Sequence, residues 1–223
     1  MSKKLEQKQA RREAEERRKK EAKKAARKRN LITLGLALVV TAAVVALVVA
    51  DRQAADAPTG VSAAAADCGD IEDVEAVSRD HIDQGAPHEP YNSNPPTNGP
   101  HLGVPADTGF YSTPLPVEQP IHNLEHGQIV IWYSPDAPSD VVDDIEAIVE
   151  KEPAATLATP FEGFEGDGNF ALTAWTAGET EAEDDFGTGH LQMCEQVSQE
   201  VVDDFRREFQ GKSPEPLTPR FTG

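Results

Sequence analysis

The sequence has few of the residues on which common catalytic motifs depend. Its 223 residues include only two cysteines and two methionines. The cysteines do not form a Cys-x-x-Cys pair, and the chain contains neither a Gly-x-Ser-x-Gly motif nor a phosphate-binding glycine loop. A Ser, His and Asp pattern typical of a hydrolase triad is also absent from the sequence. The sequence therefore gives no support for thiol redox exchange, a serine hydrolase or a nucleotide-binding protein.

Positive charge is scarce after residue 50. The chain has seven Lys and Arg against 34 Asp and Glu there, about −27, whereas residues 1–30 have 14 Lys and Arg against five Glu, about +9. Nucleic acid is itself an anion, so we expect no nucleic-acid partner for the acidic part. A polybasic segment is attracted to anionic lipid head groups. We therefore expect residues 1–30 to form a basic cytoplasmic tail that contacts anionic lipids.

Residues 31–50 carry no charge at all. At a rise of about 1.5 Å per residue, a helix of this length matches a hydrocarbon core of roughly 30 Å, so the segment predicts a transmembrane helix. Lys and Arg cluster directly before it, and only Arg52 follows closely, so the N-terminus is expected in the cytoplasm and the C-terminus outside. A cleaved signal peptide is the alternative, although its apolar region usually has about 7 to 15 residues.

The remainder of the chain predicts one folded domain. Residues 51–66 are rich in Ala and Asp and predict a flexible spacer. Residues 67–211 predict a single compact extracytoplasmic α+β domain, in which helices pack on a small mixed sheet. Residues 212–223 contain three prolines and predict a C-terminal tail.

Hydrophobic periodicity predicts the elements of this domain. They are helices over 70–82, from Ser139 and over 191–210, and strands over 128–133, 155–159 and 169–176. Nine prolines between residues 85 and 120 exclude regular helix and central strands, so we expect a long, stiffened loop region there. Loops of this length usually have a function.

Cys68 and Cys194 are the two cysteines. An even pair outside the cytoplasm most often forms a disulfide, so we expect the two residues to be bonded. The bond would close a loop of more than a hundred residues, worth about 4 kcal/mol in the chain-entropy model. A redox or metal-binding role for Cys194 is the alternative.

Histidine is concentrated in the Pro-rich region. Pro and Gly residues around His101 predict a rigid loop that holds the ring in place. His122 and His126 are four residues apart, so one helical turn would place both imidazoles on one face, as metal ligands require. Three imidazoles suit copper or zinc, and the thioether of Met193 would favour copper. The sequence predicts a metal site at these four residues, copper first and zinc second, with His81 outside it on the helix over 70–82.

Two other interpretations of the same residues are open. The pattern HNLEH at 122–126 matches H-x-x-E-H, in which two histidines bind zinc and the glutamate activates water, so Glu125 would be the base of a zinc-dependent hydrolase. Such enzymes carry the motif in a long helix, whereas Pro120 and Gly127 flank it here. In the other interpretation, these side chains bond to loop carbonyls in a structural or interaction domain of the cell envelope, and Met193 packs in a core.

Two motifs resemble the bacterial domain-of-unknown-function family 3105. They are PPTNGPH at residues 95–101 and HNLEHG at 122–127, which is followed by IVIWY. The resemblance covers roughly residues 80–210, and Asn98 departs from the serine that the family more often has. It implies a membrane-anchored or exported protein and no reaction, because the family name assigns none. Within the two motifs, the resemblance directs attention to His101, His122, Glu125 and His126.

Overall fold

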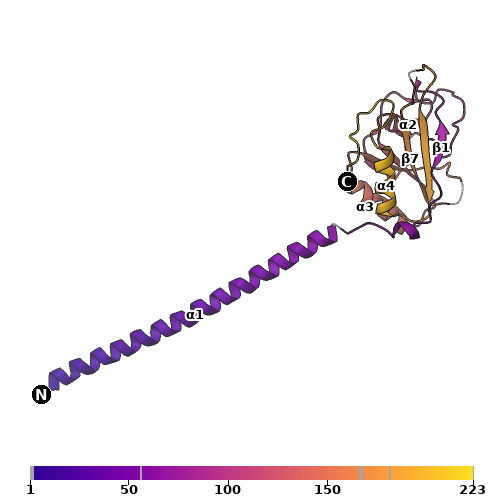
Figure 1. Cartoon of the computed structure of the whole chain (residues 1–223). Helices are drawn as coiled ribbons and strands as arrows, with labels where there is room; N and C mark the ends of the chain where they lie inside the picture. The colour runs from indigo at the N-terminus through magenta and orange to yellow at the C-terminus, as the bar shows by residue number, and fades with distance from the viewer. Residues whose placement is uncertain (1–2, 56, 166–167, 181, 223) are drawn as a thin grey trace. The chain divides into compact units, whose positions relative to one another are not determined.

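The computed structural model describes residues 3–55, 57–165, 168–180 and 182–222 (Figure 1). Contacts divide the chain into two units, Met1–Ala57 and Pro58–Gly223. The first unit contains one helix, α1 (Lys3–Ala55). Residues 31–50 are exposed on every side of that helix, and its most apolar window has a mean hydropathy of 2.8. By length and composition, α1 is the one helix among the described residues that could cross a membrane.

The second unit is an α+β domain built on a six-stranded mixed sheet, as the sequence predicts. The strand order is β1-β8-β7-β5-β6-β4. The strands are β1 (Glu72–Glu75), β4 (Gly109–Phe110), β5 (Ile129–Tyr133), β6 (Thr156–Pro160), β7 (Phe170–Thr176) and β8 (Thr188–Cys194). β6 pairs in parallel with β4 and β5, and the other pairs are antiparallel. A separate parallel pair joins β2 (His81–Ile82) to β3 (His101–Leu102).

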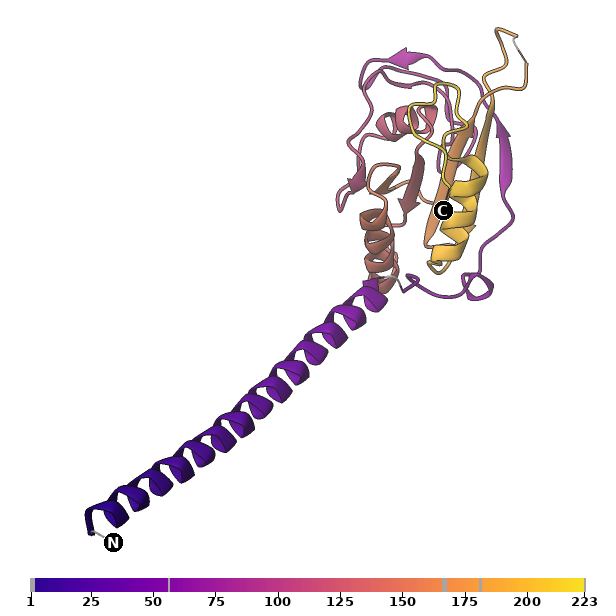
Figure 2. The ribbon, with the colours of Figure 1, turned by 60° about the vertical axis from the view of Figure 1, so that its left-hand side comes forward.

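Helices and loops cover both faces of the large sheet. The domain helices are the short 3-10 helix η1 (Ala63–Ala65), α2 (Glu118–Glu125), α3 (Ser139–Lys151) and α4 (Gln199–Phe209). Side chains alternate along a strand, so Ile129 and Ile131 of β5 pack with α3 and α4, while Val130 and Trp132 pack with α2. Figure 2 shows α4 in yellow lying along the orange strand β7. Because both faces are covered, every residue of β5 is buried.

The predicted helix over 70–82 is wrong. Residues 72–75 form β1, which pairs antiparallel with β8, and residues 81–82 form β2. Ile71 and Val77, which suggested a helical stripe, are 41% and 50% exposed, so no buried helix face exists there. By contrast, β5, α3, β6 and β7 lie where the sequence predicts them.

The predicted helix over 191–210 is correct only in its second half. Its first residues belong to β8, which pairs with β7 on one side and β1 on the other, and α4 begins at Gln199. Strand pairing on both sides overrides the local preference for a helix. The strand places Cys194 opposite Cys68, and the predicted disulfide between them is present, 126 residues apart along the chain.

Candidate metal centre

Four side chains from three segments converge beside the face of the sheet that α2 covers. His81 lies on β2, His101 on β3, and His122 and Glu125 on α2. The register of the parallel pair sets His81 opposite His101. One donor atom from each of the four residues lies within 4.8 Å of each of the others. We call these residues the His/Glu group.

The Pro-rich loop holds His101 by internal hydrogen bonds. The buried Asn98 accepts the Val77 N–H at 3.1 Å through Oδ1, and the Tyr91 hydroxyl donates to the Pro100 carbonyl at 2.8 Å. Gly99 has φ +115°, a backbone conformation that side chains disfavour. These contacts fix the loop against its surroundings, and the His101 ring at its end is completely buried.

α2 is a short helix whose boundaries follow from its sequence. Pro120 lies in its first turn, where a proline costs no hydrogen bond, and Gly127, with φ +86°, follows its last turn. His122 and Glu125 are three residues apart and therefore share one face. The HNLEH motif thus occupies the end of an eight-residue helix.

Backbone carbonyls fix the tautomers of two histidines. Nδ1 of His101 lies 2.8 Å from the Gly99 carbonyl oxygen, and Nδ1 of His122 lies 2.7 Å from the Leu102 carbonyl oxygen. A carbonyl oxygen only accepts, so each Nδ1 carries the proton. In metal-binding histidines, one ring N–H is commonly held in this way while the other nitrogen faces the ion. Nε2 of both rings is therefore the atom available to a metal.

The distances from the Glu125 carboxylate to two imidazoles are close to those between neighbouring ligands of one metal ion. Its Oε2 lies 3.1 Å from His101 Nε2 and 3.5 Å from His81 Nε2. Metal–ligand bonds of about 2.0 to 2.1 Å in a tetrahedron separate neighbouring donors by about 3.3 Å. The His/Glu group can therefore hold a metal ion with small adjustments of its side chains.

Burial and neighbouring charges shift two pKa values in this group. Burial alone would raise the pKa of Glu125, but the hydrogen bond and charge of His101, together with His81, lower it overall. Burial is the main cause that lowers the pKa of His122, with the charges of His126 and His101 adding to it. Glu125 is thus ionised and His122 neutral near pH 7, the forms that bind metals.

The family model described as protein of unknown function (DUF3105) matches residues 81–221. The chain belongs to this family. The match begins at His81 and includes all four residues of the His/Glu group. No curated protein and no solved structure matches the chain. The family description assigns no activity.

Two of the predicted ligands of this DUF3105 domain lie outside the His/Glu group. The ring of His126 lies 4.5 Å from that of His122, but its Nδ1–H donates to the Glu215 carbonyl at 2.9 Å. The C-terminal segment also donates the Leu217 N–H to the His126 carbonyl. Met193 lies on β8, opposite Ala171. The structure therefore brings together His101, His122 and Glu125, whereas the predicted ligands His126 and Met193 do not belong to the group.

Sequence reasoning missed His81, because the helix predicted over 70–82 placed it away from the loops. Its partner segment, β3, lies 20 residues further along the chain. The available signal was the cluster of Ser, Asp and Gly between residues 78 and 85, which argues against a helix and for a turn-rich segment.

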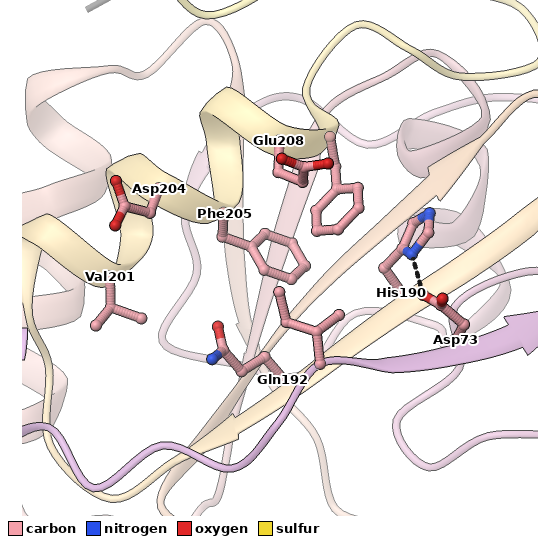
Figure 3. A pocket seen from close by; sticks show the side chains of 9 residues that line it. Asp73, His190, Gln192, Val201, Asp204, Phe205 and Glu208 are labelled. Carbon is pink, nitrogen blue, oxygen red and sulfur yellow. Dashed lines mark hydrogen bonds and ion pairs between the residues drawn. The ribbon is translucent and has the colours of Figure 1, made fainter.

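A groove of about 590 Å³ lies on the opposite face of the sheet, between β8 and α4 (Figure 3). At its edge, His190 Nδ1 donates to Asp73 Oδ1 at 2.7 Å, and Thr176 Oγ1 lies 2.9 Å from His190 Nε2. The order of hydroxyl, imidazole and carboxylate matches that of a triad, which the sequence did not suggest. However, Ala177 N–H, next to the hydroxyl, donates to the Lys212 carbonyl and is not free to stabilise an oxyanion. Asp73, His190 and Thr176 therefore form a row of hydrogen-bonded side chains across the paired strands β1, β8 and β7.

Proposed function

We propose that the domain binds a divalent transition-metal ion through the imidazoles of His81, His101 and His122 and the carboxylate of Glu125. The observation that carries this proposal is the pair of buried histidines whose Nδ1–H groups are fixed by carbonyls. This arrangement leaves Nε2 of both rings available, and Nε2 of His101 lies 3.1 Å from the ionised carboxylate of Glu125. Such preorganisation is typical of metal ligands and their supporting contacts.

Copper is the first candidate and zinc the second. Three imidazoles and one carboxylate suit both ions, and Cu²⁺ binds a given nitrogen and oxygen site more tightly than the other divalent first-row ions. Met193 lies on β8 with its methyl group beside Gly168, so we expect no thioether ligand that would favour Cu⁺. The expected cofactor is therefore Cu²⁺ wherever the two metals compete.

A zinc-dependent hydrolase is the second candidate function. It would use Glu125 as the base that activates a metal-bound water. The position of Glu125 gives it less support, because Oε2 already lies within hydrogen-bonding distance of His101 Nε2. The third candidate function is that of an interaction domain of the cell envelope without a ligand. Absence of metal binding by the chain would favour it.

We further propose that α1 anchors the chain in the cell membrane by a single pass. Its apolar stretch and the basic residues before it support a cytoplasmic N-terminus in contact with anionic lipids. The Cys68–Cys194 disulfide is consistent with an extracytoplasmic domain, because disulfides persist in oxidising compartments.

Metal analysis of the full chain in detergent tests the proposal. After dialysis against copper or zinc, the parent chain should retain about one ion, while His101→Ala should retain far less. His88→Ala is the matched control, because His88 lies outside the His/Glu group and contacts Glu89 and Glu118. A parent chain without metal, or a His101→Ala chain that retains as much as the parent, would refute the site.

A further inference from the structure

The four residues of the His/Glu group differ in their access to solvent. His101, His122 and Glu125 are 0%, 4% and 1% exposed. The His81 side chain, in contrast, is 52% exposed. An ion held by this group would therefore have three buried ligands and one ligand on the solvent side. Any molecule that delivers or removes the ion has to approach from the side of His81.

His81 is also the ligand with the weakest support. His101 and His122 each donate Nδ1–H to a backbone carbonyl, and Glu125 extends from a helix. Among the described residues, His81 contacts Glu125 at 3.5 Å and the rings of the other two histidines, with no backbone carbonyl on its Nδ1. It lies on a strand of two residues whose flanking residues are exposed. Rotation of its side chain would leave the three buried ligands in place.

Gly103 lies directly beside the His81 side chain. This residue is exposed, and a Cβ atom placed on it would lie 3.7 Å from Cβ, Cγ and Nδ1 of His81. Its φ is not in the left-handed region, so a side chain is compatible with the backbone. A larger residue at position 103 would fill the space next to the His81 ring.

We propose that the metal site is an exchange site, in which His81 is the displaceable ligand. The partner is a metal donor or acceptor that offers a neutral imidazole. Its nitrogen forms a bond to the ion as the bond from His81 Nε2 breaks, while His101, His122 and Glu125 remain bound. Neutral ligands replace each other, so no electron is transferred and the metal keeps its charge. This inference rests on the proposed function, since it requires that the group binds a metal.

Transfer kinetics of the zinc-loaded full chain test this inference. A synthetic peptide with two histidines serves as the acceptor, and the zinc content of the peptide after its separation from the chain measures the transfer. For the parent, the transfer rate should rise with peptide concentration, because the incoming imidazole takes part in the exchange. His81→Ala should bind zinc more weakly than the parent but more tightly than His101→Ala, and it should release the ion at least tenfold faster than the parent. Gly103→Leu should bind zinc as the parent does but transfer it several-fold more slowly.

The outcomes separate the two proposals. If the parent chain binds zinc and the His81→Ala variant exchanges zinc at the parent rate, the exchange inference alone is overturned. The same holds if His81→Ala loses zinc as completely as His101→Ala, because His81 would then be an integral ligand. A parent that binds neither zinc nor copper would overturn the proposed function, and the exchange inference with it.

Discussion

His101 Nε2 lies 3.1 Å from Glu125 Oε2, and both side chains are almost fully buried. Because His101 Nδ1 already donates to Gly99, this contact requires one further proton between the ring nitrogen and the carboxylate. A metal ion that binds both atoms has to displace it. If the domain binds a metal as proposed, the ion replaces this proton.

The first prediction is that metal binding releases the proton shared in this contact, because a bound ion takes its place between the two atoms. Isothermal titration of the full chain with zinc, in buffers that differ in ionisation enthalpy, measures the number of protons released. Glu125→Gln cannot form the charged pair and should release a smaller number. Zinc binding without proton release would show that the ion does not replace the proton of the His101–Glu125 contact.

The second prediction concerns the role of Glu125. As a ligand, it should be essential for affinity, so Glu125→Gln should weaken zinc binding by about a hundredfold, or about 2.7 kcal/mol. A glutamate that only activates water could be neutralised with the metal retained. Competition with a zinc indicator measures the change. His126→Ala, next to it but outside the His/Glu group, should change the affinity by less than about threefold.

The third prediction concerns topology. The basic residues before position 31 should keep the N-terminus inside, so an N-terminal tag should be protected from protease in intact cells and a C-terminal tag should be cleaved. The apparent mass of the chain tests the alternative, because removal of a signal peptide would shorten it by about 50 residues. The opposite pattern of protection would exclude the proposed orientation.

Elements whose burial follows from their own residues could be predicted from local sequence patterns. β5 is a continuous apolar run covered on both faces, and α3 has one apolar stripe, so each could be predicted without knowledge of its neighbours. β8 could not, because its strand state depends on pairing with β7 and β1. For the same reason, Met193 lies on a strand and not on the predicted helix face.

The candidate site could be predicted only in part, for a similar reason. His101 and His122 were found because Pro and Gly residues frame them locally. His81 joins them through a two-residue parallel pair, which leaves no periodic signal in the sequence. His126 lies next to His122 as its spacing predicts, but its Nδ1–H is directed to Glu215, 89 residues away. Contacts between distant segments decided which histidines face the same point.

The fourth prediction concerns the packing of the Pro-rich loop on the sheet. A Cβ atom on Gly189 of β8 would lie 2.0 Å from Thr97 Oγ1 and 2.9 Å from Asn98 Nδ2. Gly189→Ala should therefore lower the stability of the domain by about 1 to 3 kcal/mol, which corresponds to a decrease in Tm of several degrees. Displacement of the loop should also weaken metal binding through His101.

Gly69→Ala is the control for this substitution, because its nearest neighbour, the Met193 carbonyl oxygen, lies at an ordinary 3.9 Å. Thermal unfolding of the two variants and the parent measures the difference. Equal Tm values for Gly189→Ala and Gly69→Ala would show that the loop does not depend on this close approach.

The last prediction concerns pH and His190. Burial, including the ring of Phe209 stacked on it, lowers the pKa of His190 more than Asp73 raises it. The folded domain therefore binds fewer protons at this residue than the unfolded chain does, so the contribution is fully present above the unfolded pKa of about 6.5 and declines as pH falls below it. His190→Gln removes the titrating group. Urea unfolding at pH 7.5 and 5.5 should show a smaller loss of stability for this variant than for the parent, and an equal loss would contradict the lowered pKa.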